Sequence, residues 1–220
     1  MSLTEELANR ASEGWAALPP ERRDMYQRAA AALEASGIAE RVLREGATAP
    51  EFALPDAMGR TVRLSDLLAV GPVILSFYRG QWCPFCNLEL RALQRALADV
   101  KAARVTLVAV SPNTPDISLA TVEELNLDFP VLSDHDNLVA KKFNLVYEMT
   151  PENVDMYRRH GRDVAAMNGV DKWELPIPAT YVIDRDRTIC YAFIDLNHRR
   201  RADPSEVISV AASLTVERAS

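Results

Sequence analysis

Residues 77–90 read FYRGQWCPFCNLEL and place two of the chain's three cysteines at the junction of a strand and a helix. The run at residues 73–78 is continuously apolar, which is typical of a central strand covered on both faces of a sheet. Residues 84–100 follow with leucines at helical spacing, so we expect one long helix there. Cys83 and Cys86 therefore lie where the strand gives way to the helix.

A helix start is a place in a fold where a thiolate is readily stabilised. The first turn leaves backbone N–H groups unpaired and carries the positive end of the helix dipole. Pro84 fits this turn, where its missing N–H costs nothing. A spacing of three residues puts both sulfurs on one side of the turn, close enough to form a disulfide. We predict a redox dithiol in which an exposed Cys83 attacks and a more buried Cys86 resolves.

Two other interpretations of this cysteine pair are open. A structural zinc site needs four ligands, usually two pairs, and the remaining candidate ligands form no pair: Cys190, His135, His160 and His198. Two buried cysteines without chemistry are the other alternative, although a strand end before a helix favours a reactive thiol. We therefore expect no metal and no organic cofactor.

The composition is that of an ordinary globular chain with an acidic balance. Its 220 residues are 48% hydrophobic and 25% charged. The net charge of −6 argues against non-specific nucleic-acid binding, and the basic run at residues 198–201 is interpreted as a solvated turn or a set of ion-pair partners. No run approaches the roughly 18 apolar residues of a membrane span, and the first residues lack the pattern of a secretion leader. We expect a cytoplasmic protein, where a close cysteine pair is catalytic or metal-binding rather than structural.

Strands and helices alternate around the cysteine turn, which indicates an α/β fold with a mixed sheet. Residues 1–44 form an N-terminal helical extension that is interrupted at Pro19 and Pro20. We expect it to be a packing extension or the contact of a homodimer, and a lid or an interaction arm is the less favoured alternative. Residues 45–220 form the main domain, with residues 147–176 as an insertion of loop and helix. The expected elements of the main domain are a hairpin at 46–68, strands at 105–110 and 129–132, a hairpin at 180–194 and a closing helix at 205–214.

Five stretches together resemble the alkyl hydroperoxide reductase and thiol-specific antioxidant (peroxiredoxin-like) family of thioredoxin-fold proteins. They are GATAPEFALPDAMGRTVRLSDLL, FYRGQWCPFCNLEL, VTLVAVSP, FPVLSD and IPATYVIDRDRTI, and the resemblance runs from residue 45 to residue 214. The FYRGxWCPxC core is similar to a subgroup with a Cys-x-x-Cys turn. The resemblance implies a thioredoxin-like, peroxiredoxin-type fold of three layers. It also implies an antioxidant enzyme that reduces hydrogen peroxide or organic hydroperoxides and is reset by an external thioredoxin-like dithiol.

The chain departs from the family's Pro-x-x-x-Thr-x-x-Cys pattern. If Cys86 takes the peroxide-reacting position, Cys83 stands at the Thr, and if Cys83 takes it, Gly80 stands there. Neither register supplies the hydroxyl, and Pro178 replaces the family's arginine before the later strand. Arg79 is a candidate replacement cation, although a surface ion pair accounts for it equally well. The residues that we assign to substrate binding or activation are Arg79, Trp82 and Pro178.

Pro178 resembles the proline that thioredoxins place opposite their active turn, commonly after a cis peptide. The Ile177–Pro178 bond is a candidate for that geometry, and an ordinary trans proline at a strand edge is the alternative. A thioredoxin-like protein disulfide reductase is therefore the runner-up function. A third hypothesis is a redox-responsive binding protein without turnover, whose surface is the segment at residues 147–173.

Three further residues carry weaker interpretations. Cys190 is flanked by apolar neighbours, which favours a buried small hydrophobe over a distant resolving cysteine. His135 lies in the polar stretch SDHDN, which favours a turn residue or helix cap over a general base. Glu89 is expected on a solvated helix face, with a proton shuttle to Cys86 as the less favoured alternative.

Overall fold

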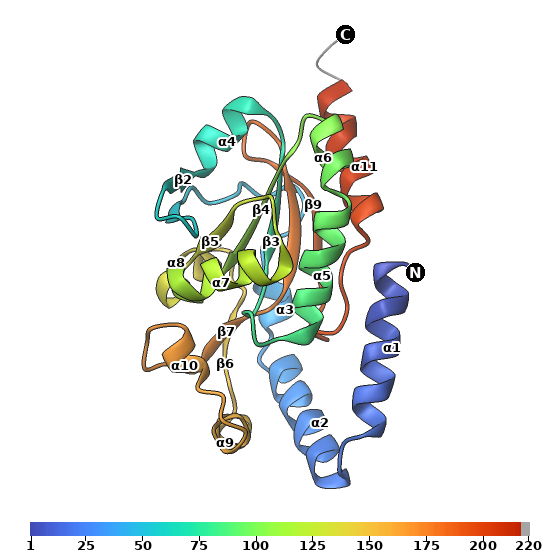
Figure 1. Ribbon diagram of the computed structural model, residues 1–220, viewed down its shortest axis with the longest axis vertical. Coiled ribbons are helices and arrows are strands. Elements are labelled where there is room, and N and C mark those ends of the chain that lie inside the picture. The colour runs from blue at the N-terminus through green and yellow to red at the C-terminus, as the bar shows by residue number, and fades with distance from the viewer. Residues whose placement is uncertain (217–220) are drawn as a thin grey trace.

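The computed structural model describes residues 1–216, and a mixed sheet of five strands forms its centre (Figure 1). The strands are β3 (Val73–Phe77), β4 (Thr106–Ser111), β5 (Val131–Ser133), β8 (Ala179–Ile183) and β9 (Ile189–Ile194). Their order is β5-β4-β3-β8-β9, with β3 parallel to β4 and antiparallel to β8. Every residue of β3 is buried, so the continuous apolar run is the central strand, as predicted.

Helices cover both faces of the sheet, which confirms the three-layer α/β fold (Figure 1). Successive residues of a strand point to opposite faces, and Ile74 and Leu75 accordingly belong to two different core clusters. Ile74 packs in the cluster that holds apolar residues of α5 (Pro84–Arg95), α6 (Leu97–Ala102), α7 (Pro115–Leu125) and α11 (Pro204–Val216). Leu75 packs in the cluster that holds apolar residues of α4 (Leu64–Val70) and α8 (Leu138–Lys142).

The structure corrects the expected helix at residues 84–100 and gives the strand limits of the expected hairpin. The helix expected at residues 84–100 is interrupted at Ala96, whose backbone (φ −89°, ψ 1°) leaves the helical region, so that α6 begins at Leu97. Leu90 and Leu93 of α5 and Leu97 of α6 nevertheless belong to the same core cluster. The expected hairpin before the sheet is present as β1 (Ala53–Pro55) paired antiparallel with β2 (Thr61–Arg63).

The N-terminal helices are α1 (Leu3–Ala16), α2 (Pro20–Ala35) and α3 (Ile38–Arg41), and the break falls at Pro19 and Pro20 as predicted. Leu3 and Leu7 of α1 bury against Ala92 of α5. The apolar face of α1 is therefore covered by its own chain, which favours the packing interpretation of this extension. We propose residues 1–44 and 45–220 as the two parts of the chain.

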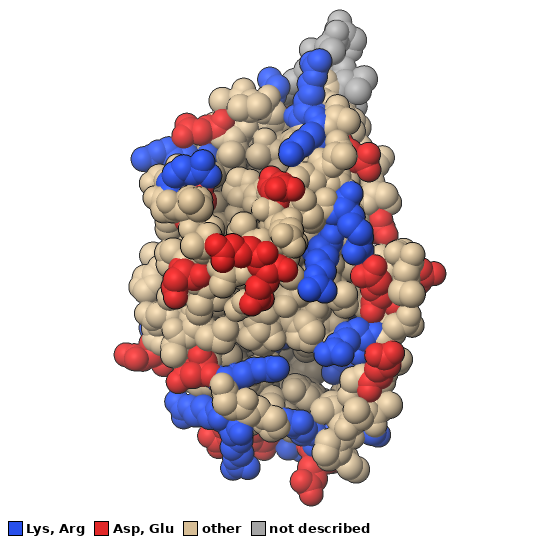
Figure 2. All heavy atoms as spheres, viewed as in Figure 1, with Lys and Arg blue, Asp and Glu red and all other residues tan. Residues whose placement is uncertain are grey.

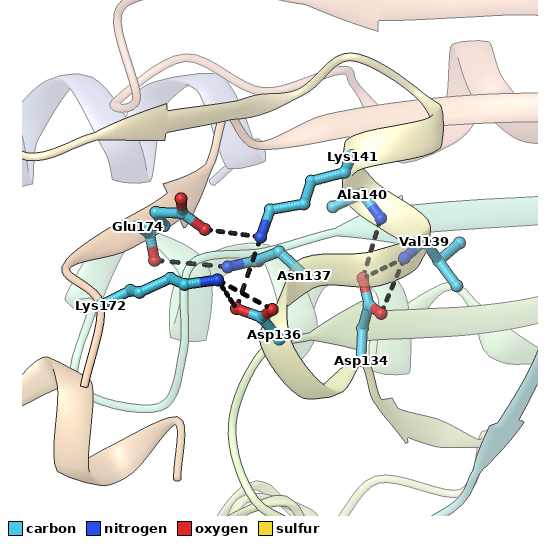
Figure 3. A network of polar contacts seen from close by, with 8 residues as sticks. All are labelled: Asp134, Asp136, Asn137, Val139, Ala140, Lys141, Lys172 and Glu174. Carbon is cyan, nitrogen blue, oxygen red and sulfur yellow. Dashed lines mark hydrogen bonds and ion pairs between the residues drawn. The ribbon is translucent and has the colours of Figure 1, made fainter. Parts of the chain in front are cut away.

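The insertion contains more regular structure than the expected loop and helix. Besides α9 (Pro151–Arg159) and α10 (Val164–Met167), it includes β6 (Val146–Glu148) paired antiparallel with β7 (Glu174–Pro176). A network of polar contacts joins β7 to the turn before α8 (Figure 3). Lys141 pairs with Glu174 at 2.7 Å and with Asp136 at 3.4 Å, and Lys172 reaches Asp136 at 3.1 Å. This network fixes the end of the insertion, at Lys172 and Glu174, to the main domain.

The stretch SDHDN, residues 133–137, ends β5 and forms the turn before α8, and its Asp134 side chain binds the first turn of that helix. The Asp134 carboxylate is buried and accepts hydrogen bonds from the backbone N–H of Val139 at 2.9 Å and of Ala140 at 2.8 Å (Figure 3). His135 is exposed in the 3-10 turn η1 (His135–Asn137), so the prediction of a turn residue is confirmed. The carboxylate rather than the imidazole makes the cap because it can accept two N–H groups at once.

Charged side chains of both signs are interspersed on the face drawn in Figure 2. That face shows no broad surface of one sign among the residues that the structure describes. No helix within residues 1–216 has both the length and the apolar character needed to cross a membrane.

Candidate active site

The two cysteines lie at the carboxyl end of β3, where the chain turns into α5. Cys83 is the N-cap of α5, with extended backbone, and Pro84 occupies the first helical turn. Gly80 makes the preceding turn with φ +136°, and a Cβ there would lie 2.7 Å from the Trp82 indole nitrogen. The turn therefore requires glycine both for its backbone conformation and for the close approach of Trp82.

Both sulfurs are buried, which contradicts the expectation of an exposed Cys83. The exposed fraction is 1% for Cys83 and 0% for Cys86, and both are free thiols. The reason is packing: both cysteines belong to the core cluster on the α5 face, and Trp82 and Phe85 pack against that cluster. A substrate reaches Cys83 only if it passes these side chains or if they move.

Arg79 brings a positive charge to Cys83 from inside the protein. Its guanidinium Nη1 lies 3.9 Å from the Cys83 sulfur, and its Cζ lies 4.7 Å from the centre of the Trp82 ring. Arg79 is only 5% exposed, so the interpretation of a surface ion pair is wrong. Within residues 1–216, neither Arg79 Nε nor the Trp82 indole N–H has a hydrogen-bond partner. The site thus holds two unused donors beside the first cysteine.

The electrostatics favour Cys83 as the thiolate of the pair. A hydrogen bond from the Cys86 thiol holds the pKa of Cys83 well below its ordinary value, and the charges of Arg79 and Arg201 act in the same direction against burial. Burial raises the pKa of Cys86 well above its ordinary value, and the neighbouring Cys83 sulfur adds to this. The arrangement therefore separates the pair into one thiolate and one thiol.

A buried ion pair between Arg201 and Glu89 lies next to Cys86, although the sequence favoured a solvated position for Glu89. Arg201 donates to the Cys86 sulfur from Nη2 at 3.2 Å and forms an ion pair with the Glu89 carboxylate. Glu89 is 2% exposed and also accepts hydrogen bonds from Ser76 at 3.5 Å and Thr180 at 3.4 Å. The expectation of a solvated Glu89 is wrong, because this helix position faces the sheet together with Cys86. The basic run at residues 198–201 was expected to be a solvated turn or a set of ion-pair partners, and the second alternative is confirmed for Arg201.

A network of asparagines supports the active turn from the side of the insertion. The Asn113 side chain accepts from the backbone N–H of Gln81 at 2.9 Å and donates to Asn168 at 2.9 Å. Asn113 follows β4, whereas Asn168 follows α10, and both are buried. The insertion thus helps to hold the turn that carries the cysteines.

Pro178 lies beside the active turn and shares a cavity with Arg79. The register of β3 and β8 pairs Phe77 with Ala179, which puts Pro178 across from the start of the turn. No peptide bond within residues 1–216 is cis, so the trans alternative for Ile177–Pro178 is confirmed. Arg79 and Pro178 both line a cavity of about 750 Å³. Of the residues assigned from the sequence, Arg79, Trp82 and Pro178 thus all lie around the cysteine pair.

Cys190 is remote from the pair. It precedes Tyr191 of β9, which pairs with Val182, and Val182 pairs with Ile74 near the start of β3. The active turn follows the opposite end of β3. Cys190 is half-buried rather than fully buried, so the expectation of a core residue is only partly correct. Within residues 1–216 no group of three or more His, Cys, Asp or Glu residues could hold a metal ion.

We expect the Cys83 thiolate of the reduced protein to form at a pH well below about 8.5, the ordinary value for a cysteine. As the pH is raised, the ultraviolet absorbance of the thiolate should appear in the wild type with a midpoint well below that value. Cys83→Ser should remove this transition. Arg79→Gln should shift it to higher pH, because the thiolate loses a nearby positive charge. Cys190→Ser is the matched control and should leave it unchanged. Mass-spectrometric mapping in which limiting iodoacetamide labels Cys86 or Cys190 before Cys83 would contradict this assignment.

The fold and the buried pair of Cys83 and Cys86 define a thioredoxin-fold protein with a dithiol at its active turn. The model of the AhpC/TSA family matches residues 46–192, and the chain belongs to that family. The family accounts for the hairpin, the sheet and the cysteine turn. The N-terminal helices and the segment that carries Arg201 lie outside the match.

Similar proteins include both peroxiredoxins and a thiol-disulfide oxidoreductase. The chain is 31% identical over 103 residues to peroxiredoxin Bcp of Escherichia coli (strain K12), a match that covers 47% of this chain and 65% of that protein. It is 34% identical over 101 residues to the thiol-disulfide oxidoreductase ResA of Geobacillus kaustophilus, covering 46% of this chain and 57% of ResA. The chain thus spans about two thirds or less of the length of these curated relatives. The crystal structure of the peroxidoxin BcpB from Mycobacterium tuberculosis shares the fold, with a TM-score of 0.60 and 24% identity over 80% of this chain and 97% of that one.

Proposed function

We propose that the chain is a thiol peroxidase that reduces hydrogen peroxide or organic hydroperoxides through Cys83 and Cys86. The observation that carries this proposal is the position of Arg79. Its buried guanidinium lies 3.9 Å from the Cys83 sulfur and at the same time lines the cavity of about 750 Å³. Cys83 itself does not line this cavity, so a peroxide bound at the Arg79 guanidinium reaches the Cys83 thiolate when the side chains around Cys83 move.

The reaction uses each cysteine once per cycle. The Cys83 thiolate attacks one peroxide oxygen, an S–O bond forms, the O–O bond breaks, and the leaving oxygen takes a proton to give water or an alcohol. The Cys86 thiol then attacks the sulfenic acid, which releases water and forms the Cys83–Cys86 disulfide. An external dithiol of the thioredoxin type then reduces this disulfide by thiol–disulfide exchange. The external dithiol becomes a disulfide, and Cys83 and Cys86 return to thiols.

Unused donors near Cys83 support this chemistry where the family's threonine and strand arginine are missing. As the O–O bond breaks, negative charge develops on the leaving oxygen, and a donor aimed at it lowers the barrier. Arg79 Nε and the Trp82 indole N–H are buried and lack partners among the described residues. We assign them this role.

Protein disulfide reduction is a second candidate function. It needs a thiolate of low pKa, which Cys83 offers, and a backbone edge on which a disulfide can dock. We assign that edge to the segment at Pro178, which is buried in this structure and has to become accessible. The similarity to ResA favours it as well. The low pKa of Cys83 also makes its sulfur a good leaving group, which helps disulfide exchange more than raw nucleophilicity.

The cytoplasm is the compartment that we propose for this cycle. Thiols are kept reduced there, and a thioredoxin-type dithiol is at hand to reset the pair. A homodimer through the N-terminal helices is less favoured, because Leu3 and Leu7 are already buried within the chain.

The experiment is steady-state turnover coupled to thioredoxin, thioredoxin reductase and NADPH, with hydrogen peroxide, cumene hydroperoxide and insulin as substrates. We expect peroxide turnover in the wild type and none in Cys83→Ser. Cys86→Ser should consume one equivalent of peroxide and then stop, whereas the control Cys190→Ser should turn over normally. Oxidised wild type should run as a monomer on non-reducing electrophoresis, because the disulfide is intramolecular.

Three results would reject this scheme. Insulin reduction without peroxide consumption would favour the disulfide reductase. Absence of turnover with every substrate would favour the redox-responsive binding protein. Covalent dimers of the oxidised wild type would show that the disulfide is intermolecular, and Cys86 would then not be the resolving cysteine.

A further inference from the structure

The cavity beside Arg79 is built largely by parts of the chain outside the family match. Its walls come from α2, from the start of the insertion at residues 146–150, and from the loop at residues 196–199. The family match begins at residue 46 and ends at residue 192, so both α2 and that loop lie outside it. In Figure 2 the surface is hollowed at the level where α2 and the insertion meet the main domain in Figure 1.

The cavity is much larger than hydrogen peroxide requires. A volume of about 750 Å³ lies within the range of roughly 300 to 1,000 Å³ that is typical of sites for small organic molecules. Four aromatic side chains contribute to the lining: Trp15, Tyr26, Tyr147 and Tyr157. Such a wall stabilises the flat, apolar body of a ligand by burial and by ring contacts.

Three arginines line the same cavity, Arg41, Arg79 and Arg199, and none of them has a carboxylate partner among the described residues. Arg41 donates to the backbone oxygen of Ser36 at 3.0 Å. Arg79 contacts the Cys83 sulfur, and Arg199 lies with its Cζ 5.0 Å from the centre of the Trp15 ring. Burial lowers the pKa of Arg199, which reflects the cost of removing an unpaired charge from water. Glu34 and Glu148 also contribute to the lining, but both are exposed, and neither forms an ion pair with these arginines in residues 1–216. The interior of the cavity is therefore electropositive.

We propose that this cavity binds an arylalkyl hydroperoxide that carries a carboxylate, with the carboxylate at Arg199 and the peroxide at Arg79. This inference rests on the proposed peroxidase function and names the substrate class for the same site. In this proposal the ring of the ligand packs on the aromatic lining, while its two polar ends reach Arg79 and Arg199. The thiol chemistry is unchanged: the O–O bond breaks at Cys83, the alcohol leaves, and the external dithiol supplies both electrons.

Binding is measured first, without turnover. The probes are para-isopropylbenzoate and its methyl ester, and the protein is the full chain with Cys83→Ser, titrated by calorimetry. We expect the carboxylate to bind about tenfold or more tightly than the ester, since a hydrogen bond to a charged group contributes about 1.5 to 3 kcal/mol. Arg199→Gln should abolish the difference. Arg200→Gln is the matched control and should retain it, because Arg200 pairs with Asp195 at the surface and does not line the cavity. Equal affinity for acid and ester, or a preference that survives Arg199→Gln, overturns the inference.

Turnover then separates this inference from the proposed function. The substrates are cumene hydroperoxide and the same compound with a para-carboxylate, which differ only in that group. We expect kcat/KM to be about tenfold higher for the carboxylate in the wild type and in Arg200→Gln, and the ratio to fall towards one in Arg199→Gln. Turnover of both compounds without a preference overturns the inference and leaves the peroxidase proposal standing. Tight binding of the carboxylate probe without turnover of any peroxide overturns the peroxidase proposal and this substrate class with it.

Discussion

Replacement of Arg79 by alanine is expected to lower kcat/KM for hydrogen peroxide by about 100- to 1,000-fold, the loss typical of a removed transition-state donor. The guanidinium lies 3.9 Å from the Cys83 sulfur and is the cation that can face both the thiolate and the leaving oxygen. Arg79→Ala removes the charge and the donors together. Disulfide exchange involves no such leaving oxygen, so insulin reduction should fall by much less.

Two companion variants and a folding control make this test specific. Arg79→Lys keeps the charge but loses the planar fork, so it should recover only part of the peroxide activity. Arg200→Ala removes a nearby arginine that is exposed and paired with Asp195, and it should behave as wild type. Urea unfolding of each variant must show a folded protein, because Arg79 is buried and stacks on Trp82. Rapid peroxide turnover in folded Arg79→Ala would show that another group activates the peroxide.

The elements of the fold were predictable because the signals that specify them are local. The apolar run at residues 73–78 predicted the central strand, and the pair of prolines at residues 19–20 predicted the break between the first helices. The capping position before Pro84 likewise placed Cys83 at a helix start. Each of these depends on residues a few positions apart, so a single sequence contains the whole signal.

The surroundings of the cysteines were less predictable because they depend on contacts between distant segments. Arg201 reaches Cys86 across 115 positions of the chain, and nothing near it in the basic run marks it as the buried member. Glu89 did carry a signal that was missed. It follows Cys86 by three positions and precedes the buried Leu93 by four, so the helical period puts it on the inner face. A polar residue on an inner face indicates a buried partner.

The same argument explains why the exposure of Cys83 was predicted wrongly. A helix start is usually near the surface, but here Trp82 and Phe85 pack over the core cluster that contains the two cysteines. The additional helices and the insertion then enclose the approach to Arg79 and Pro178 in a cavity. The N-terminal helices lie outside the family match at residues 46–192, so the resemblance gave no information about how they limit access.

Loss of Arg201 is expected to be the most destabilising single change near the site. Arg201 and Glu89 form an ion pair with both side chains almost fully buried, at 1% and 3% exposure. Arg201→Leu leaves the Glu89 carboxylate buried without its cation, and such a change costs about 3 to 5 kcal/mol of unfolding free energy. The double variant Arg201→Leu with Glu89→Leu removes both charges and should recover most of that loss. Arg200→Leu, at an exposed position, should have little effect.

The pH dependence of stability distinguishes a buried charge from a simple packing defect. Burial raises the pKa of Glu89 even with Arg201 present, so the folded state binds the Glu89 proton more tightly than the unfolded chain does. Without Arg201 this pKa rises further, and a raised carboxyl pKa makes stability fall as pH rises above the unfolded value of about 4.3. The defect of Arg201→Leu should therefore grow between pH 5 and pH 8 in urea unfolding of the reduced protein, whereas the double variant should show no such trend. A double variant as unstable as Arg201→Leu would show that Arg201 acts through packing rather than through its charge.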